Sequence, residues 1–260
     1  MTAYVSALRI RHWVKNLFLF AAPFFGGSLA SQTVISFALP AFLAFSFASS
    51  AVYIFNDIQD IAYDRRHPKK KNRPVTSGNI TIKNAYITAI LLVFISSVLS
   101  IFISLQFFFI VVIYIFIHIA YSLWLKDIPV VDLLCIASGF LLRVLAGGAA
   151  FHVDVSTWLL LTMFTISLVL ASGKRIGETI SLNEHAIKQR KALRYYSQSV
   201  LRAILLISAS ASLITYVMYT LEQHEGLVYT VPVVLFGLFR YIVLARKGFG
   251  DPTDAMTKDK

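Results

Sequence analysis

Carboxylates recur at helical spacing in one short polar stretch, residues 56–73. Asp57, Asp60 and Asp64 are spaced i, i+3, i+7, so on a helix they would share one face. Three like charges on one face repel each other unless a cation binds between them. Magnesium takes hard oxygen ligands and usually binds through one or two carboxylates together with substrate phosphates. The spacing therefore predicts a magnesium site, in preference to a solvated loop of mixed charge.

Cationic residues follow these carboxylates within a few positions and could pair with phosphate groups. They are Arg65, Arg66, Lys69, Lys70, Lys71 and Arg73. Basic loops are common beside membrane helices, so these cations alone would be weak support for a binding site. A basic loop does not need three carboxylates on one helical face, however. The two sets together predict a site for a metal-bound diphosphate.

Other polar residues at or inside apolar runs are candidates for binding substrate, and the cations among them could bind a second phosphate. They are Lys15, Asn16, Tyr121, Lys126, Asp132, Arg143, Lys174, Arg175 and Glu178. Some have a purely structural alternative. Tyr121 and Lys126 could mark an interfacial turn between two helices. Lys174 and Glu178 are four residues apart and could form an ion pair on a helix.

Arg143 lies about nine positions inside its apolar run, where an arginine is costly and usually paired. It could pair with Asp132 or another carboxylate, and we favour a ligand phosphate as its partner. The neighbouring glycines Gly139, Gly147 and Gly148 predict close helix packing.

The elements that position these residues are membrane helices. The chain has 260 residues, of which 57% are hydrophobic and 14% charged, whereas soluble domains carry about 25% charged residues. Eight apolar runs approach the roughly 20 residues that span a bilayer. They cover residues 15–31, 34–56, 80–103, 106–125, 130–151, 156–173, 199–221 and 227–246. This pattern predicts an all-α integral membrane protein with a single domain over residues 1–260.

The distribution of basic residues predicts the orientation of these helices. Lys and Arg are absent from the loops near 31–33, 104–105, 152–155 and 222–226. This alternation places the N-terminus and the loops near 57–79, 126–132 and 174–198 in the cytoplasm. The net charge of +11 is explained by membrane orientation and anionic substrates, and we expect no nucleic-acid partner. The long loops after the second and sixth runs suggest two helical halves around a cytoplasm-facing cavity.

The stretch Asn56-Asp57-x-x-Asp60-x-x-x-Asp64-Arg65 resembles the first aspartate-rich motif of the UbiA superfamily of intramembrane prenyltransferases. The resemblance is closer to the decaprenyl-phosphate phosphoribosyltransferase branch. Its matching segments are residues 11–16, 20–23, 64–74, 121–132, 139–148, 173–178 and 250–254. Typical superfamily members have a second aspartate-rich motif after the sixth span, where this chain has Lys174, Arg175 and Glu178.

This resemblance implies a UbiA-type bundle around a cytoplasm-facing cavity, with nine membrane helices, of which eight are visible and a ninth is not. It implies transfer of 5-phosphoribose from phosphoribosyl diphosphate (PRPP) to a polyprenyl phosphate, in cell-envelope polysaccharide precursor synthesis at the bacterial inner membrane. Mg²⁺ held by Asn56, Asp57, Asp60 and Asp64 would bind the diphosphate leaving group. Arg65, Lys70 and Arg73 would assist.

Two other functions fit parts of the pattern. An ordinary UbiA-type prenyltransferase, joining a prenyl diphosphate to an aromatic acceptor, would share the first motif, but the replaced second motif argues against it. A transporter would also carry charges within membrane helices. Here the charges gather at one membrane face and do not continue across it. A homo-oligomer is compatible with the sequence.

Overall fold

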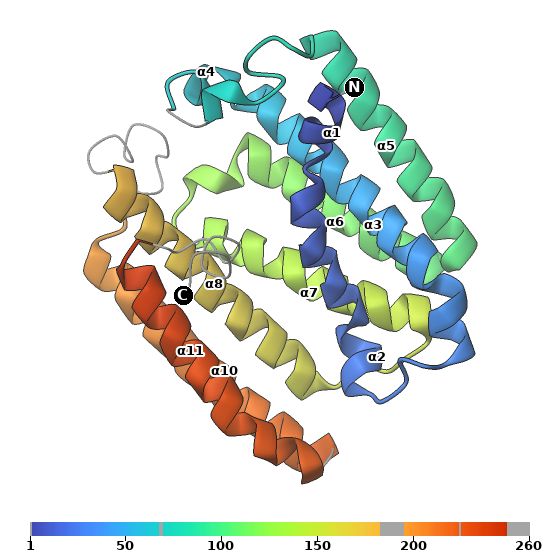
Figure 1. Ribbon diagram of the computed structural model, residues 1–260, viewed down its shortest axis with the longest axis vertical. Coiled ribbons are helices and arrows are strands. Elements are labelled where there is room, and N and C mark those ends of the chain that lie inside the picture. Colours follow the sequence, from blue (N-terminus) through green and yellow to red (C-terminus); the bar gives the residue numbers. More distant parts are fainter. Residues whose placement is uncertain (1, 68–69, 183–194, 224, 249–260) are drawn as a thin grey trace. The chain divides into compact units, whose positions relative to one another are not determined.

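The computed structural model describes residues 2–67, 70–182, 195–223 and 225–248, and the regular structure in these ranges is entirely helical (Figure 1). Seven helical stretches in these ranges are long and apolar enough to cross a membrane. They are Gln32–Gln59, Ile82–Ile103, Leu105–Leu123, Val131–Phe151, Thr157–Ile180, Gln198–Glu222 and Gly226–Arg246. The prediction of an all-helical, multi-pass membrane protein is therefore confirmed.

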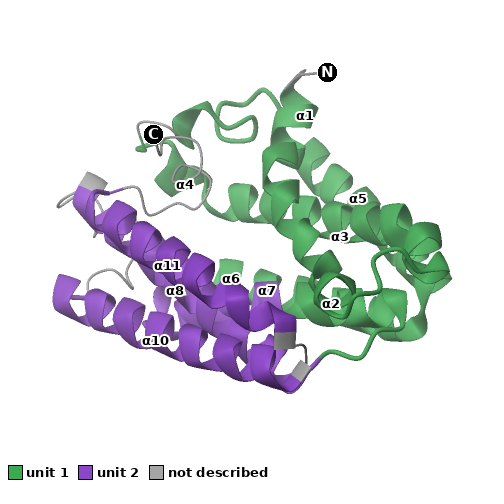
Figure 2. Cartoon of the chain, turned by 60° about the horizontal axis from the view of Figure 1, so that its bottom comes forward, with its two compact units in different colours: residues 1–124, 142–155 green, residues 125–141, 156–260 purple. Residues whose placement is uncertain are grey.

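The chain divides into two compact units (Figure 2). Unit 1 comprises residues 1–124 and 142–155, and unit 2 comprises residues 125–141 and 156–260. The elements that begin in unit 1 are α1 Thr2–Leu8, η1 Ile10–Phe20, α2 Ala21–Phe25, α3 Gln32–Gln59, α4 Ile61–Asp64, η2 Lys70–Asn72, α5 Ile82–Ile103 and α6 Leu105–Leu123. The elements that begin in unit 2 are η3 Leu125–Asp127, α7 Val131–Phe151, α8 Thr157–Leu182, α10 Gln198–Gln223, η5 Glu225–Thr230 and α11 Val231–Arg246.

The predicted membrane helix over residues 15–31 is wrong as a single element. A 3₁₀ helix, η1, runs to residue 20, and the short α2 ends at residue 25. Pro23 is the third residue of α2, within the first turn, where proline is tolerated. Gly27 then adopts a left-handed conformation with φ 66°, which breaks the chain direction.

The predicted cytoplasmic loops are shorter than expected. Helix α8 continues to residue 182, well into the loop predicted over 174–198. Within this extension Arg175 and Glu178 pair at i, i+3, with 2.8 Å between Nη1 and Oε2. Helices α4 and η2 occupy parts of the 57–79 loop, and η3 occupies part of the 126–132 loop. Residues 183–194 lie outside the described residues.

Hydroxyl side chains fix where three helices of unit 1 begin. Ser31, Thr81 and Ser104 each accept a hydrogen bond from the backbone N–H three residues later, at 3.0 to 3.3 Å. Each bond satisfies one of the amide groups that a helix start leaves without an intrahelical partner. These caps define the starts of α3, α5 and α6.

Helix α3 is the centre of unit 1 and packs along α5 and α6 (Figure 1). The Ser96 hydroxyl of α5 donates to the Ala44 carbonyl of α3 at 2.8 Å. Phe45, Phe107 and Tyr114 are fully buried in the core between these helices. Gly147 lets the backbones of α7 and η1 touch, since a Cβ there would lie 1.8 Å from the Leu19 carbonyl oxygen. The predicted packing role of Gly147 is therefore confirmed.

Helices α8 and α10 lie side by side in unit 2, and α11 packs against α8 (Figure 1). The hydroxyls of Thr162 and Thr215 are 3.1 Å apart. Tyr241 of α11 donates to the Leu170 carbonyl of α8 at 3.1 Å. Its ring fills the space beside Gly173, where a Cβ would lie 2.4 Å from the tyrosine oxygen. These contacts fix the C-terminal half of α8, which carries the predicted Lys174, Arg175 and Glu178.

Candidate active site

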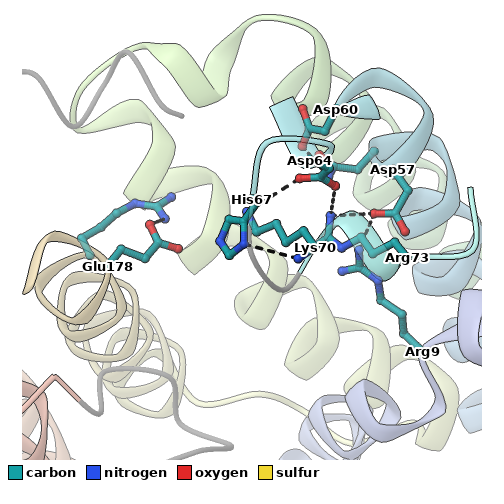
Figure 3. Close-up of polar contacts among 10 residues, drawn as sticks. Arg9, Asp57, Asp60, Asp64, His67, Lys70, Arg73 and Glu178 are labelled. Atoms are coloured by element: carbon teal, nitrogen blue, oxygen red, sulfur yellow. Dashed lines mark hydrogen bonds and ion pairs between the residues drawn. The ribbon is translucent and has the colours of Figure 1, made fainter. Parts of the chain in front are cut away.

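Two of the predicted aspartates converge on one cationic nitrogen in unit 1 (Figure 3). Nη1 of Arg73 lies 3.0 Å from Oδ1 of Asp57 and 2.5 Å from Oδ2 of Asp64. Both carboxylates are nearly inaccessible, with exposed side-chain fractions of 2% and 4%. The ammonium of Lys70 lies 4.0 Å from the other oxygen of Asp64. Asp57 and Asp64 therefore lie close enough to share a cation.

Arg9 is a second partner of Asp57, and it comes from the short link between α1 and η1. Its Nη2 pairs with Oδ1 of Asp57 (Figure 3). Its guanidinium also lies over the ring of Tyr53, at 4.9 Å from the centroid. Burial lowers the pKa of Arg9, and the attraction of Asp57 opposes that shift. The backbone of Arg9 is left-handed, with φ 52° and ψ 49°.

Asn56 and Asp60 form a separate pair beside the shared carboxylates. Nδ2 of Asn56 donates to Oδ2 of Asp60 at 2.9 Å, and Oδ1 of Asn56 accepts from Ser122 at 3.1 Å. The helix that was expected to carry all three aspartates ends at Gln59, and α4 then begins at Ile61. The amide of Asp64 nonetheless bonds the Asp60 carbonyl at 2.8 Å, so the helical course continues across the junction.

The donor atoms of this cluster suit magnesium, because they are carboxylate and amide oxygens. Within the described ranges, no three His, Cys, Asp or Glu side chains form a metal-binding group. Two carboxylates are sufficient where phosphates supply further oxygens. Asp57 and Asp64 already share one cation, the Arg73 guanidinium. They therefore fit the ion chemically, and Asn56 and Asp60 are the adjoining donors.

Arg143 is buried in unit 1, where it contacts Asn16 and two aromatic side chains. Its Nε donates to Oδ1 of Asn16 at 2.8 Å, and its Nη2 donates to the Tyr114 hydroxyl at 3.1 Å. Its guanidinium also lies about 5 Å from the ring centroids of Tyr114 and Phe45. The alternative in which Asp132 pairs with Arg143 is wrong, since Asp132 accepts from other groups. The structure brings the predicted Asn16 and Arg143 together.

Asp132, Arg175 and Glu178 form a network in unit 2. Nε of Arg175 donates to Oδ2 of Asp132 at 2.9 Å, and its Nη1 donates to Glu178 at 2.8 Å. The Tyr196 hydroxyl donates to Oδ1 of Asp132 at 2.8 Å and accepts from the Val130 amide. Burial, with a contribution from Asp132, raises the pKa of Tyr196 above its ordinary value, so the hydroxyl keeps its proton.

The remaining predicted residues are placed individually. Arg65 is exposed. Lys15, Tyr121, Lys126 and Lys174 are half-buried, and each has at least one interaction partner. Lys69, among the cations named above, lies outside the described residues.

Sequence reasoning missed four residues that the structure places in these networks, namely Arg9, Tyr114, Ser122 and Tyr196. Arg9 and Asp57 are 48 positions apart, and Ser122 and Asn56 are 66 apart, so no local spacing connects them. Tyr114 lies in a strongly apolar run that gives no polar signal.

The comparisons with known proteins identify the class. A model of the UbiA prenyltransferase family matches residues 17–256. The chain therefore belongs to this family, and it is a membrane transferase. Among solved structures, a UbiA homolog from Archaeoglobus fulgidus bound to GPP and Mg²⁺ superimposes with a TM-score of 0.79 at 20% identity, covering 93% of this chain and 86% of that one. At this identity the likeness shows the fold.

Curated relatives define a branch within the family. The chain is 34% identical over 269 residues to the decaprenyl-phosphate phosphoribosyltransferase of Corynebacterium glutamicum, covering 98% of this chain and 81% of the relative. It is 33% identical over 278 residues to the enzyme of the same name from Mycolicibacterium smegmatis, covering 100% and 87%. The predicted membership of the UbiA superfamily is confirmed, and relatives named for the predicted branch align over nearly the whole chain.

Proposed function

We propose that this protein transfers 5-phosphoribose from PRPP to a polyprenyl phosphate and releases diphosphate. The names of its full-length relatives support this reaction. The structural observation that carries it is the pair of buried carboxylates, Asp57 and Asp64, that share one cation beside further arginine and lysine side chains. That arrangement suits a metal-bound diphosphate, which is the leaving group of PRPP.

Asp57 and Asp64, with Asn56 and Asp60 beside them, would hold Mg²⁺. The ion would neutralise charge that develops on the departing diphosphate. Arg73 and Lys70 lie at the same carboxylates and carry the charge to contact diphosphate oxygens. Arg65 follows Asp64 in the sequence and is exposed. We propose it as a further contact to the diphosphate oxygens.

The nucleophile in this reaction is an oxygen of the lipid phosphate. It forms a bond to the anomeric carbon of the ribose while the bond from that carbon to the diphosphate breaks, and the diphosphate leaves with the electron pair. A phosphate oxygen is already ionised near neutral pH, so no strong general base is required. The protein would contribute mainly positioning and electrostatic stabilisation.

The second and third phosphate groups, on the ribose and on the lipid, need cationic partners. Lys15, Tyr121, Lys126, Arg143 and Lys174 are our candidates. Arg143 is the most constrained, because the bonds to Asn16 and Tyr114 fix its guanidinium plane.

Asp132, Arg175 and Glu178 have a different proposed role from the predicted contact with substrate. Both Nε and Nη1 of Arg175 bind carboxylates, and only 1% of its side chain is exposed. We assign this network to fixing the cytoplasmic end of α8, from which Lys174 projects.

We further propose that residues 1–260 act as one catalytic domain in the bacterial inner membrane, with the N-terminus and the aspartates on the cytoplasmic side. The absence of Lys and Arg from alternate loops supports this orientation. Participation in cell-envelope polysaccharide precursor synthesis follows from the proposed product.

A UbiA-type prenyltransferase reaction is the second candidate, because a protein of the same fold is solved with GPP and Mg²⁺. The two reactions are separated by incubating membranes that contain the protein with Mg²⁺ and either substrate pair. One tube holds PRPP and decaprenyl phosphate, and the other holds a polyprenyl diphosphate and 4-hydroxybenzoate. Phosphoribosylated lipid that disappears with a chelator supports our proposal. Prenylated aromatic product alone would replace it with the second candidate.

A further inference from the structure

Arg9 combines a strained backbone with a buried charge. A left-handed conformation is strained in a residue other than glycine and persists where surrounding contacts enforce it. Here the contacts are the Tyr53 ring and the Asp57 carboxylate, both on α3. Such strain gathers at functional sites. The link between α1 and η1 therefore adopts a costly conformation that delivers one guanidinium to the aspartate cluster.

Two arginines converge on the same oxygen of Asp57. Nη2 of Arg9 and Nη1 of Arg73 both contact Oδ1 (Figure 3). Among the residues that the structure describes, Oδ2 of Asp57 accepts no hydrogen bond. The arginines thus fix the carboxylate through one oxygen and leave the other for a further ligand. Groups that bond a metal-binding carboxylate in this way orient it.

The carboxylates that contact these cations do not outnumber them. Asp57 and Asp64 pair with Arg9, Lys70 and Arg73, so two carboxylates face three cationic side chains. A bare divalent cation gains little net attraction from groups that carry no net negative charge. A divalent cation already bound to diphosphate carries net negative charge and is attracted by the arginines.

We propose that Arg9 is a positioning residue that makes this site select a divalent cation bound to diphosphate over the bare cation. This inference rests on the diphosphate site of the proposed function. Arg9 acts through Asp57, whose Oδ1 it holds, and through its charge, which disfavours a metal that arrives without its anion.

The test is isothermal titration calorimetry on the purified full-length protein, with two probes. One titrant is Mg²⁺ alone, and the other is Mg²⁺ premixed with inorganic diphosphate. In Arg9→Met, we expect loss of the positive charge to let Mg²⁺ alone bind about tenfold more tightly and to weaken binding of the Mg²⁺–diphosphate complex about tenfold. If Arg9 were only a structural contact, its loss would weaken the binding of Mg²⁺ and of the Mg²⁺–diphosphate complex alike. Arg202→Met, at an exposed arginine of α10, is the control with the same change of charge.

Two further variants separate charge from hydrogen bonding and carry the test if Arg9→Met does not fold. Arg9→Gln keeps a donor for Asp57 without the charge, so it should behave like Arg9→Met. Arg9→Lys keeps the charge and should retain the ratio of the two affinities within about threefold of wild type. Wild-type affinities in Arg9→Gln, or parallel weakening of both titrations in any neutral variant, would overturn the proposal.

Failure of this inference is distinguishable from failure of the proposed function, because neither titration contains PRPP or lipid. If opposite shifts occur in a protein that transfers no phosphoribose, the proposed reaction is wrong and the role of Arg9 stands. If phosphoribose is transferred and Arg9→Met leaves both affinities unchanged, only the role of Arg9 is wrong.

Discussion

The ion pair between Asp132 and Arg175 should be a main determinant of the stability of unit 2, and its two sides should respond unequally to mutation. Both side chains are almost fully buried, with exposed fractions of 0% and 1%, and their atoms are 2.9 Å apart. At this distance and an effective dielectric constant of about 20, the gross attraction is about 6 kcal/mol. Desolvation offsets much of it, so the informative quantity is the cost of removing one partner.

Arg175→Met leaves the Asp132 carboxylate buried with only the Tyr196 hydroxyl as a donor. Loss of one partner of a buried pair costs about 3–5 kcal/mol, because the other charge stays uncompensated. Asp132→Asn is milder, since the amide oxygen can still accept a bond and Arg175 keeps Glu178. We expect Asp132→Asn to lower the free energy of unfolding by about 1–2 kcal/mol. In the double variant the fully buried carboxylate of Asp132 is gone, so it should be more stable than Arg175→Met alone.

The assay is the free energy of unfolding in mixed micelles, titrated with sodium dodecyl sulfate and followed by circular dichroism. Arg202→Met, an exposed arginine of α10, is the control and should change stability by less than about 0.5 kcal/mol. If the double variant lost as much stability as the two single variants together, Asp132 and Arg175 would not be coupled, and the ion-pair argument would be refuted. If Arg175→Met retained its stability and lost only transferase activity, Arg175 would be a substrate-binding residue after all.

Three further predictions follow from individual contacts. Gly147→Ala should destabilise the protein by about 1–3 kcal/mol in the same titration, because its Cβ would meet the Leu19 carbonyl, whereas Gly237→Ala, which faces open space, should not. The raised pKa of Tyr196 means that its contribution to wild-type stability is fully present below about pH 10 and is lost above it. Tyr196→Phe should remove this contribution to the pH dependence of stability, which thermal unfolding measured at several pH values would show. Asp64→Asn should lower kcat/KM for PRPP about 100-fold with little loss of stability, and unchanged kcat/KM would argue against its role in metal binding.

The sequence predicted the helical membrane class and most helix positions because these depend on local composition. The runs over 80–103 and 130–151 differ from α5 and α7 by at most two residues at either end. The run over 15–31 failed for a physical reason: hydropathy reports what a segment can bury and not whether its backbone is α-helical. Pro23 and Gly27 were the local signals of that interruption.

The candidate site was predictable where its chemistry is local. The spacing of Asp57 and Asp64 indicated that they could share a cation, and they share Arg73. Partners that the fold brings from distant segments were not predictable, and Arg9 is the clearest case. Its approach to Asp57 depends on one left-handed residue between α1 and η1, for which the sequence offers no glycine as a signal.

The central claim is tested most directly by the stoichiometry of the proposed reaction. Purified protein would be incubated with Mg²⁺, decaprenyl phosphate and PRPP labelled with ¹⁴C in the ribose, and both labelled lipid and diphosphate would be measured over time. We predict one diphosphate released for each labelled lipid formed, with both rates lost in Asp57→Asn. Diphosphate release without labelled lipid, or lipid formation unaffected by Asp57→Asn, would contradict the account.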